Sequence, residues 1–168
     1  MKIVITGPEC SGKSTIANEI CRIFNFGLVP EMAREYLNIR NNCYDESSLN
    51  EIAYLQLREE KIAKENHDHI CCDTDLLTII IWQSEKYGHV DHVFMEKWLR
   101  SSADIYFLCF PDMDWEYDPQ RENPHDREKL FSIYLQYLEV NKANYYILKG
   151  TVSQRMEILG QVLMSVAF

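Results

Sequence analysis

The chain has few basic residues relative to its acidic ones. Its 168 residues include 17 Lys and Arg against 26 Asp and Glu, which gives a formal net charge of −9 at pH 7. Proteins that bind nucleic acid need clustered Lys and Arg to neutralise phosphates. The composition therefore argues against a nucleic-acid-binding surface. It leaves room for a small basic pocket that holds a single triphosphate.

Long hydrophobic runs and paired cysteines are also lacking. No apolar run reaches the length of a membrane span, and Met1 leads straight into an apolar segment without room for a signal peptide. None of the six cysteines forms a C-x-x-C pair, which argues against a zinc ribbon. We expect a cytoplasmic protein with reduced cysteines and no membrane partner.

The length and composition favour one folded unit. Hydrophobic residues make up 46% of the chain, enough for a full core, and there is no internal repeat or linker. We expect residues 1–168 to form a single domain. The sequence leaves open whether that domain forms a homo-oligomer.

Residues 7–14, Gly-Pro-Glu-Cys-Ser-Gly-Lys-Ser, match the phosphate-binding pattern G-x-x-x-x-G-K-[ST]. An apolar, β-branched run precedes the motif at residues 2–6, and a segment with helical apolar spacing follows it at residues 15–24. Strand, glycine loop and helix are the context that this motif requires. The alternative is a tight strand-to-helix turn that binds nothing.

The chemistry of the motif follows from its backbone. Glycines permit close approaches, so that consecutive N–H groups point into one concavity at the positive end of the following helix. Lys13 is expected to reach the β- and γ-phosphates of ATP, and the Ser14 hydroxyl to bind Mg²⁺, with Thr15 as a lesser candidate. The expected cradle comprises Gly7, Glu9, Cys10, Ser11, Gly12, Lys13, Ser14 and Thr15.

Four further apolar segments, at residues 26–30, 69–73, 103–110 and 144–148, are predicted strands that alternate with helices. This alternation predicts an α/β fold with a five-stranded parallel sheet covered on both sides. Three local details are also predicted. A capping box at residues 48–51 starts the long helix, the charged residues around Glu60 form its solvated face, and Asn123 caps a helix that has Pro124 at its first position.

Several motifs occur in the same order as in NadR-type ribosylnicotinamide kinase domains, which the chain resembles from Met1 to about Leu159. They are residues 7–15, residues 29–36 with Pro-Glu-x-x-Arg, Asp73-Thr74-Asp75 with Leu77, Thr78 and Trp82, and Trp115 with Asp118 and Arg121. The resemblance implies a P-loop NTPase fold, a three-layer sandwich with strand order 2-3-1-4-5. It also implies phosphorylation of nicotinamide riboside by ATP. The His-x-Gly-His motif of the NadR adenylyltransferase domain is lacking, so only the kinase step is expected.

Two carboxylates are candidates for the acid–base and metal work of phosphoryl transfer. Glu31 and Asp73 each follow a predicted strand, so both should lie at the carboxyl edge of the sheet beside the P-loop. We expect Asp73, which resembles a Walker B aspartate, to serve Mg²⁺ and the acceptor, and Glu31 to act as the base. The two roles could be exchanged, and Asp112 is a weaker rival for the metal. Helix capping by Asp73 and a surface position for Glu31 are the plain alternatives.

Other polar side chains are candidates for the acceptor site. Arg34 lies one helical turn from Glu31 and could hold the substrate or simply pair with that carboxylate. Asp75, in the Asp-Thr-Asp motif, could touch the substrate or cap its helix. Gln56 is expected at a ribose or base by resemblance, and at the surface otherwise.

The segment at about residues 112–127 is polar and has too little apolar content for a core element, and it is predicted to be a lid over ATP. Lids exclude water and bring arginine to the transferring phosphoryl group, for which Arg121 is the first candidate and Arg127 the second. Trp115 could stack on a flat substrate ring or pack against the base of the lid. A disordered surface loop is the alternative for the whole segment.

The leading hypothesis is an ATP- and Mg²⁺-dependent kinase for a small nucleoside-like substrate, first of all nicotinamide riboside. A second hypothesis is a P-loop ATPase or switch that acts on a protein partner. A third keeps the kinase chemistry but has another nucleoside as acceptor.

Overall fold

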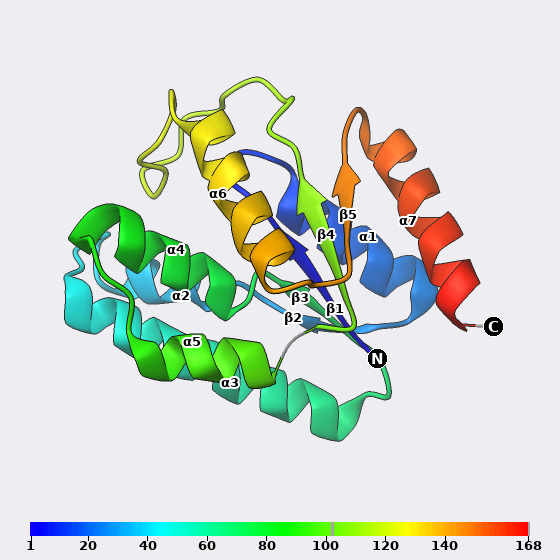
Figure 1. The fold of residues 1–168 in the computed structure, drawn as a ribbon, viewed down its shortest axis with the longest axis horizontal. Coiled ribbons are helices and arrows are strands. Elements are labelled where there is room, and N and C mark those ends of the chain that lie inside the picture. The colour runs from blue at the N-terminus through cyan, green and yellow to red at the C-terminus, as the bar shows by residue number, and fades with distance from the viewer. Residues whose placement is uncertain (102, 168) are drawn as a thin grey trace.

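The computed structural model describes residues 1–101 and 103–167, which form a five-stranded parallel sheet between layers of helices (Figure 1). The strands stand in the order β2-β3-β1-β4-β5, which confirms the predicted order. Their bounds are β1 Lys2–Thr6, β2 Gly27–Val29, β3 Ile70–Asp73, β4 Ile105–Cys109 and β5 Tyr145–Leu148.

Seven helices connect and cover these strands in the described residues. They are α1 Lys13–Phe24, α2 Met32–Ile39, α3 Glu46–Asn66, α4 Leu76–Tyr87, α5 His92–Arg100, α6 Arg127–Val140 and α7 Val152–Ala167. Helices α1 and α7 cover one face of the sheet, and α2 to α6 lie on the other (Figure 1). The predicted α/β class and the three-layer arrangement are confirmed.

The alternation of side chains along β1 produces the two cores. Ile3 and Ile5 pack toward α1 and α7, whereas Val4 between them packs toward the opposite layer. All three side chains are fully buried, as expected for a central strand of a parallel sheet. β1 pairs with β3 on one side and β4 on the other, so the loops that follow β1 and β3 emerge side by side.

Two predicted helix starts are wrong by a few residues. Helix α3 begins at Glu46, because the Asp45 side chain accepts the backbone N–H of Ser48 and the Ser48 hydroxyl closes the capping box on the Asp45 N–H. Helix α6 begins at Arg127 rather than near Pro124. Asn123 does not cap it, because its side chain is bonded to the P-loop instead.

Glu60 was expected on a solvated face of α3, and it is buried. Its carboxylate lies 2.7 Å from the Nζ of Lys2, which is also buried and donates to the carbonyl of Ser101. The helical spacing predicts that Ile62 and Ile23 lie on apolar stripes, but both are about half exposed. The sequence pattern of α3 could not reveal the ion pair because Lys2 comes from a distant strand.

No helix among the described residues has the length and hydrophobicity that a membrane crossing needs.

Candidate active site

The P-loop connects β1 to α1 and takes a conformation that two glycines make accessible. Gly7 has φ 132°, and a Cβ there would lie 2.7 Å from the carbonyl oxygen of Cys109 on β4. Gly12, at the N-cap of α1, has φ 79° and provides no side-chain cap. The first N–H groups of α1 therefore remain directed to the loop's concavity, which is the arrangement that binds phosphate.

The side chains of the loop stabilise its curve. The Ser11 hydroxyl donates to the carbonyl of Pro8 at 2.7 Å, and the Nζ of Lys13 donates to the same oxygen at 2.9 Å. Ser14 and Thr15 are exposed and border the cavity beside Lys13. The structure thus brings the whole predicted cradle together around one space.

A buried arginine that the sequence analysis missed supports the loop from behind. Arg155 of α7 is 1% exposed, and its guanidinium donates to the carbonyls of Gly150, Ser11 and Phe110 and pairs with Asp112. Asp112, the weaker metal candidate, is therefore engaged by Arg155 and by the N–H of Gly150. No local pattern in α7 distinguishes Arg155 from a surface arginine.

A cavity of about 280 Å³ opens in front of the P-loop. Its walls come from the P-loop, α2, α4, α6 and the β4–α6 segment, by which we mean residues 110–126 between β4 and α6. Its volume is close to the lower end of the range for small-ligand pockets, about 300 Å³. A single cavity is thus bordered by the phosphate cradle and by four other elements.

Glu31 and Asp73 lie near Lys13, as predicted. Burial raises the pKa of Glu31; the charge of Lys13 opposes that rise, and the negative charge of Asp73 adds to it. Burial also raises the pKa of Asp73, against the effects of Lys13 and of a hydrogen bond from Ser14. Glu31 precedes α2 without capping it, and it borders the cavity. This arrangement suits a carboxylate that exchanges a proton.

The backbone at Thr74 separates the two carboxylates of the Asp-Thr-Asp motif. Thr74 has φ 70°, a strained value for a β-branched residue, and its N–H donates to the carbonyl of Ile5. Asp73 consequently stays beside Lys13 and Ser14. Asp75 turns away, caps α4 through the N–H of Leu77, and accepts the hydroxyl proton of Tyr106 at 2.8 Å.

Two residues expected at the substrate are therefore elsewhere. Asp75 is 1% exposed in the core, and Gln56 is 2% exposed. The Gln56 side chain accepts the N–H of Met32 and donates to the carbonyl of Pro30, which fixes the start of α2. Neither residue borders the cavity, because each side chain is used to hold buried backbone or a buried hydroxyl.

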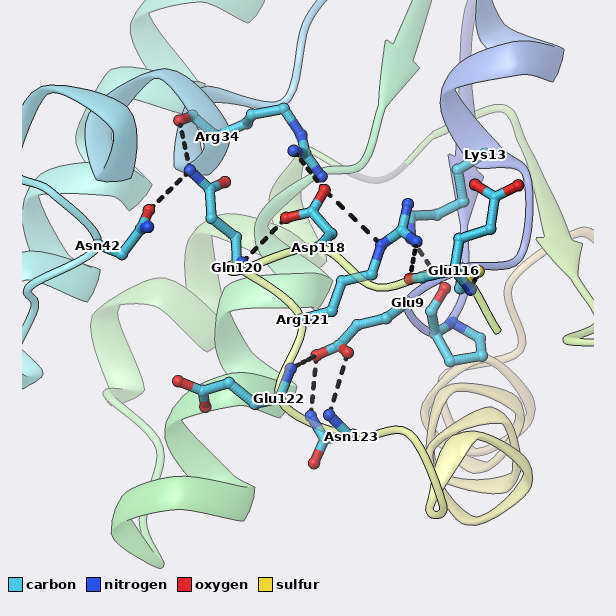
Figure 2. A network of polar contacts seen from close by, with 12 residues as sticks. Glu9, Lys13, Arg34, Asn42, Glu116, Asp118, Gln120, Arg121, Glu122 and Asn123 are labelled. Atoms are coloured by element: carbon cyan, nitrogen blue, oxygen red, sulfur yellow. Dashed lines mark hydrogen bonds and ion pairs between the residues drawn. The ribbon is translucent and has the colours of Figure 1, made fainter. Parts of the chain in front are cut away.

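Arg34 borders the cavity, and of its two predicted alternatives the ion pair with Glu31 is not formed among the described residues. Its Nη1 donates to the Oδ2 of Asp118 in the β4–α6 segment at 2.9 Å (Figure 2). Next to this pair, the amide of Gln120 donates to the side-chain oxygens of Asn38 and Asn42. The middle of the segment is thus held on α2 and the loop after it.

The β4–α6 segment is also fastened to the P-loop. The carboxylate of Glu9 accepts the backbone N–H groups of Glu122 and Asn123, both at 3.1 Å (Figure 2). The Sγ of Cys10 lies 3.3 Å from the nitrogen of Glu116, and Arg127 donates to the carbonyl of Cys10. These contacts join the segment to the P-loop beside the cavity.

Arg121 borders the cavity, as expected of a residue that meets phosphate. Its Nη1 donates to the carbonyl of Glu116 at 2.6 Å, and its Nε lies 3.9 Å from the carboxylate of Asp118. Trp115, expected to stack on a substrate, does not border the cavity. The centroid of its ring lies 5.9 Å from the Cζ of Arg121 and 5.8 Å from the Cζ of Arg127, so it packs against the base of the segment.

The part of the cavity wall that comes from α2, α4 and α6 includes apolar and aromatic side chains, most of which were not predicted as site residues. They include Leu37, Ile81, Trp82, Leu130 and Tyr134. The Trp82 indole donates to the hydroxyl of Tyr44 at 3.1 Å, and that hydroxyl donates to Glu122 at 2.7 Å. The ring orientation of Trp82 is thereby linked to the β4–α6 segment. Only the position of Trp82 near a motif could have suggested this wall.

A model of a family described as AAA domain matches residues 2–155. The chain belongs to this AAA domain family. Every residue discussed above, from the P-loop to Arg155, lies within the matched region. A comparison with curated protein sequences gives no match.

Solved structures with the same fold include several kinases. Deoxyadenosine kinase from M. mycoides is similar with a TM-score of 0.65 and 18% identity, over 98% of this chain and all of that one. A NadR protein in complex with NR is similar with a TM-score of 0.78 and 14% identity, over 97% of this chain and 50% of that one. Shikimate kinase from Acinetobacter baumannii is similar with a TM-score of 0.53 and 14% identity, over 98% of this chain and 93% of that one. At these identities the likeness concerns the fold, which is the α/β P-loop kinase fold.

The AAA-domain chain also has two neighbouring oxygen-bearing side chains that suit a divalent cation. The Oδ1 of Asp73 is buried without a hydrogen-bond partner in the described structure, and the nearby Ser14 lowers the pKa of the same carboxylate. Carboxylate and hydroxyl oxygens are the ligands that Mg²⁺ takes from a protein when phosphates supply others. Within residues 1–101 and 103–167, no three His, Cys, Asp or Glu side chains cluster as a metal cage. The donor set therefore fits a cation that arrives with a nucleotide.

Proposed function

We propose that this protein is an ATP-dependent kinase for a small nucleoside-like acceptor, with nicotinamide riboside as the first candidate. The observation that carries the proposal is a pair of carboxylates near Lys13: Glu31 borders the cavity, and the buried Asp73 lies beside Lys13 and Ser14, which border it. The same cavity has an apolar, aromatic part of its wall. A nucleotide switch needs the cradle, but it has no use for a second carboxylate near Lys13 or for a ring-sized wall.

In this proposal the residues divide the chemistry as follows. The P-loop amides and Lys13 hold the triphosphate, Ser14 and Asp73 would hold Mg²⁺, and Arg121 would meet the transferring phosphoryl group. Mg²⁺ supplies neutralisation of charge on the phosphate oxygens. Glu31 takes the proton of the acceptor hydroxyl while that oxygen bonds to the γ-phosphorus and the bond to the β,γ-bridging oxygen breaks. The products are ADP and a nucleoside monophosphate.

Charge supports a cationic acceptor ring over a neutral one. Six acids border the cavity, against the three cations Lys13, Arg34 and Arg121; the acids are Glu9, Glu31, Glu85, Asp114, Glu116 and Glu122. A pyridinium nucleoside such as nicotinamide riboside would be attracted by this excess and could stack on Trp82, because aromatic faces bind cations. We also propose that residues 1–168 act as one domain and that residues 112–127, approximately the β4–α6 segment, serve as its lid.

The decisive experiment incubates the protein with ATP, Mg²⁺ and a panel of nucleosides that includes nicotinamide riboside, adenosine and deoxyadenosine. Phosphorylated products are identified by mass spectrometry, and Lys13→Ala is the control for contaminating kinases. Product from nicotinamide riboside above all others is expected. The absence of product from every nucleoside would remove the proposal.

The AAA domain description of the family favours one rival, an ATPase that acts on a protein partner. For that rival, ATP consumption should be independent of nucleosides and should be accelerated by a protein. Parallel measurement of ADP release and nucleoside phosphate separates the two, since a kinase produces them in equal amounts.

A further inference from the structure

Glu9 occupies the middle of the P-loop, but its side chain does not stay in the cradle. Its Oε1 accepts the backbone N–H of Glu122 at 3.1 Å and the side-chain N–H of Asn123 at 2.9 Å, and its Oε2 accepts the backbone N–H of Asn123 at 3.1 Å (Figure 2). Three donors from two consecutive residues thus converge on one carboxylate.

A glutamate at position 9 of the P-loop places a negative charge beside the phosphate site, and this calls for a physical explanation. A carboxylate beside a triphosphate repels it, and the P-loop pattern leaves this position free for any residue. Three N–H groups donate hydrogen bonds to the Glu9 carboxylate and stabilise its negative charge, which reduces this repulsion. Such hydrogen bonds to an ionised acceptor are stronger than bonds between neutral groups. The charge is directed to the β4–α6 segment and away from the phosphate cradle.

The two residues that Glu9 holds directly follow Arg121. On its other side, Arg121 is fixed through its own N–H, which donates to the carbonyl of Asp118 at 3.0 Å. Asp118 in turn pairs with Arg34 of α2. Arg121 therefore lies between two attachment points, one on α2 and one on the P-loop, and its side chain borders the cavity between them.

The geometry points to Glu9 as a positioning residue that holds the β4–α6 segment on the P-loop and so places Arg121 at the phosphoryl-transfer site. Glu9 acts through the segment and does not bind the nucleotide itself, which revises its expected place among the nucleotide contacts. The role given to Arg121 rests on the proposed function, whereas the contact between Glu9 and the segment does not.

The kinetic test uses Glu9→Gln, which keeps the shape of the side chain but turns one acceptor into a donor that faces N–H groups. We expect kcat to fall about 100-fold, because a displacement of a catalytic group by about 1 Å costs that much. The KM for ATP should change less than about threefold. Glu128→Gln, an exposed acid in the first turn of α6, is the matched control and should leave both constants unchanged.

A double-mutant cycle with Arg121→Ala separates positioning from general damage. If Glu9 acts through Arg121, the double variant should be no slower than Arg121→Ala alone. Independent, multiplying losses in the double variant would overturn the proposal. So would a large rise in the KM for ATP at unchanged kcat, because that pattern belongs to a direct nucleotide ligand.

Hydrogen exchange provides a readout that needs no activity. In the protein alone, the peptide that contains the amides of Glu122 and Asn123 should exchange faster in Glu9→Gln than in the wild type or in Glu128→Gln. Equal exchange would overturn the proposal whatever the enzyme does. A wild type that phosphorylates no nucleoside, combined with faster exchange in the variant, would remove the proposed function and would still support the attachment by Glu9.

Discussion

The Nη1 of Arg34 lies 2.9 Å from the Oδ2 of Asp118, although 84 residues separate the two in the chain. The same carboxylate lies 3.9 Å from Arg121. Asp118 thus joins an arginine of α2 that borders the cavity to the arginine proposed to meet phosphate. The pKa of Asp118 lies below its usual range, mainly because the carboxylate accepts a hydrogen bond from the backbone N–H of Gln120. The charges of Arg34 and Arg121 lower this pKa further.

Replacement of Asp118 by Asn should therefore affect turnover more than stability. We expect kcat/KM for the acceptor to fall about tenfold and the KM for ATP to stay within about twofold. The free energy of unfolding should fall by no more than about 1 kcal/mol, since Arg34 is half exposed and exposed ion pairs contribute little. Steady-state kinetics and urea unfolding measure the three quantities. Glu122→Gln, which alters a different contact of the same segment, is the comparison, and a loss confined to stability would contradict the prediction.

Glu31→Gln should lower activity and raise stability. If Glu31 is the base, turnover should fall by a factor of about 10² to 10⁴ while ATP binding stays nearly intact. Burial raises the pKa of Glu31 in the folded protein, so the folded state binds its proton more tightly than the unfolded chain does. Wild-type stability must then fall as pH rises above the unfolded pKa of about 4.3 and through the folded one.

The glutamine variant lacks this pH-dependent loss. Its melting temperature should exceed that of the wild type at pH 7 to 8, by about 2–4 °C for each kcal/mol of relieved strain, and the difference should vanish below about pH 4. Calorimetry over this pH range tests the sign. An unchanged turnover would show that the base is another group, and a lower melting temperature at pH 8 would refute the account of the raised pKa.

Asp73→Asn should change the metal requirement. The variant loses the buried carboxylate oxygen that has no partner in the described structure, and with it the charge that would hold Mg²⁺ beside Ser14. The Mg²⁺ concentration for half-maximal activity should rise about tenfold or more, since the site keeps one neutral oxygen instead of an anionic one. A Mg²⁺ titration of kcat at saturating ATP measures this. The same Mg²⁺ dependence in both proteins would assign the metal role elsewhere.

The elements that the sequence predicted correctly depend on local signals. The P-loop, the five strands and their alternation with helices are encoded by glycine positions and apolar runs, and the strand order followed from the resemblance. Glu31 and Asp73 were placed correctly because both follow strands whose carboxyl ends meet at one edge of the sheet.

The errors concern side chains whose partners are distant in the sequence. Asn123 has the pattern of a helix cap, but it is taken by Glu9, 114 residues away. Gln56 and Glu60 lie on a helix with a charged sequence, and each is buried by a contact with another element. The turn at Thr74, which sends Asp75 into the core, leaves no sign in the sequence because threonine rarely adopts such a φ.

The buried pair of Lys2 and Glu60 should be essential to stability. Burial tends to lower the pKa of Lys2, but the neighbouring carboxylates of Asp75 and Glu60 outweigh it and raise the pKa. Lys2→Met would leave those acids buried without a cation and should cost about 3–5 kcal/mol in the free energy of unfolding. The cost should be larger at pH 8 than at pH 5, because a buried unpaired carboxyl favours its protonated form and stability falls as pH rises.

The double variant Lys2→Met, Glu60→Leu provides the control, since it removes the unpaired charge and should recover much of the loss. Urea unfolding at the two pH values gives the comparison. A loss for Lys2→Met that is small, or that the second substitution does not relieve, would show that the pair is not the source of the stability.

Arg155 offers a way to weaken ATP binding from behind the P-loop. Its guanidinium holds the carbonyl of Ser11 at 2.5 Å and those of Gly150 and Phe110 at 2.9 and 3.0 Å. Arg155→Lys keeps the charge but cannot supply donors in this fork geometry, so buried carbonyls should be left without partners.

For Arg155→Lys we expect a loss of about 2–3 kcal/mol in stability and a rise of about tenfold in the Kd for a non-hydrolysable ATP analogue. The kcat at saturating ATP should stay within about threefold, because the acceptor-side residues are untouched. Titration calorimetry at a temperature where the variant is fully folded isolates the binding effect, with Arg22→Lys on the exposed face of α1 as the control. A folded variant with wild-type affinity would mean that the loop keeps its shape without Arg155.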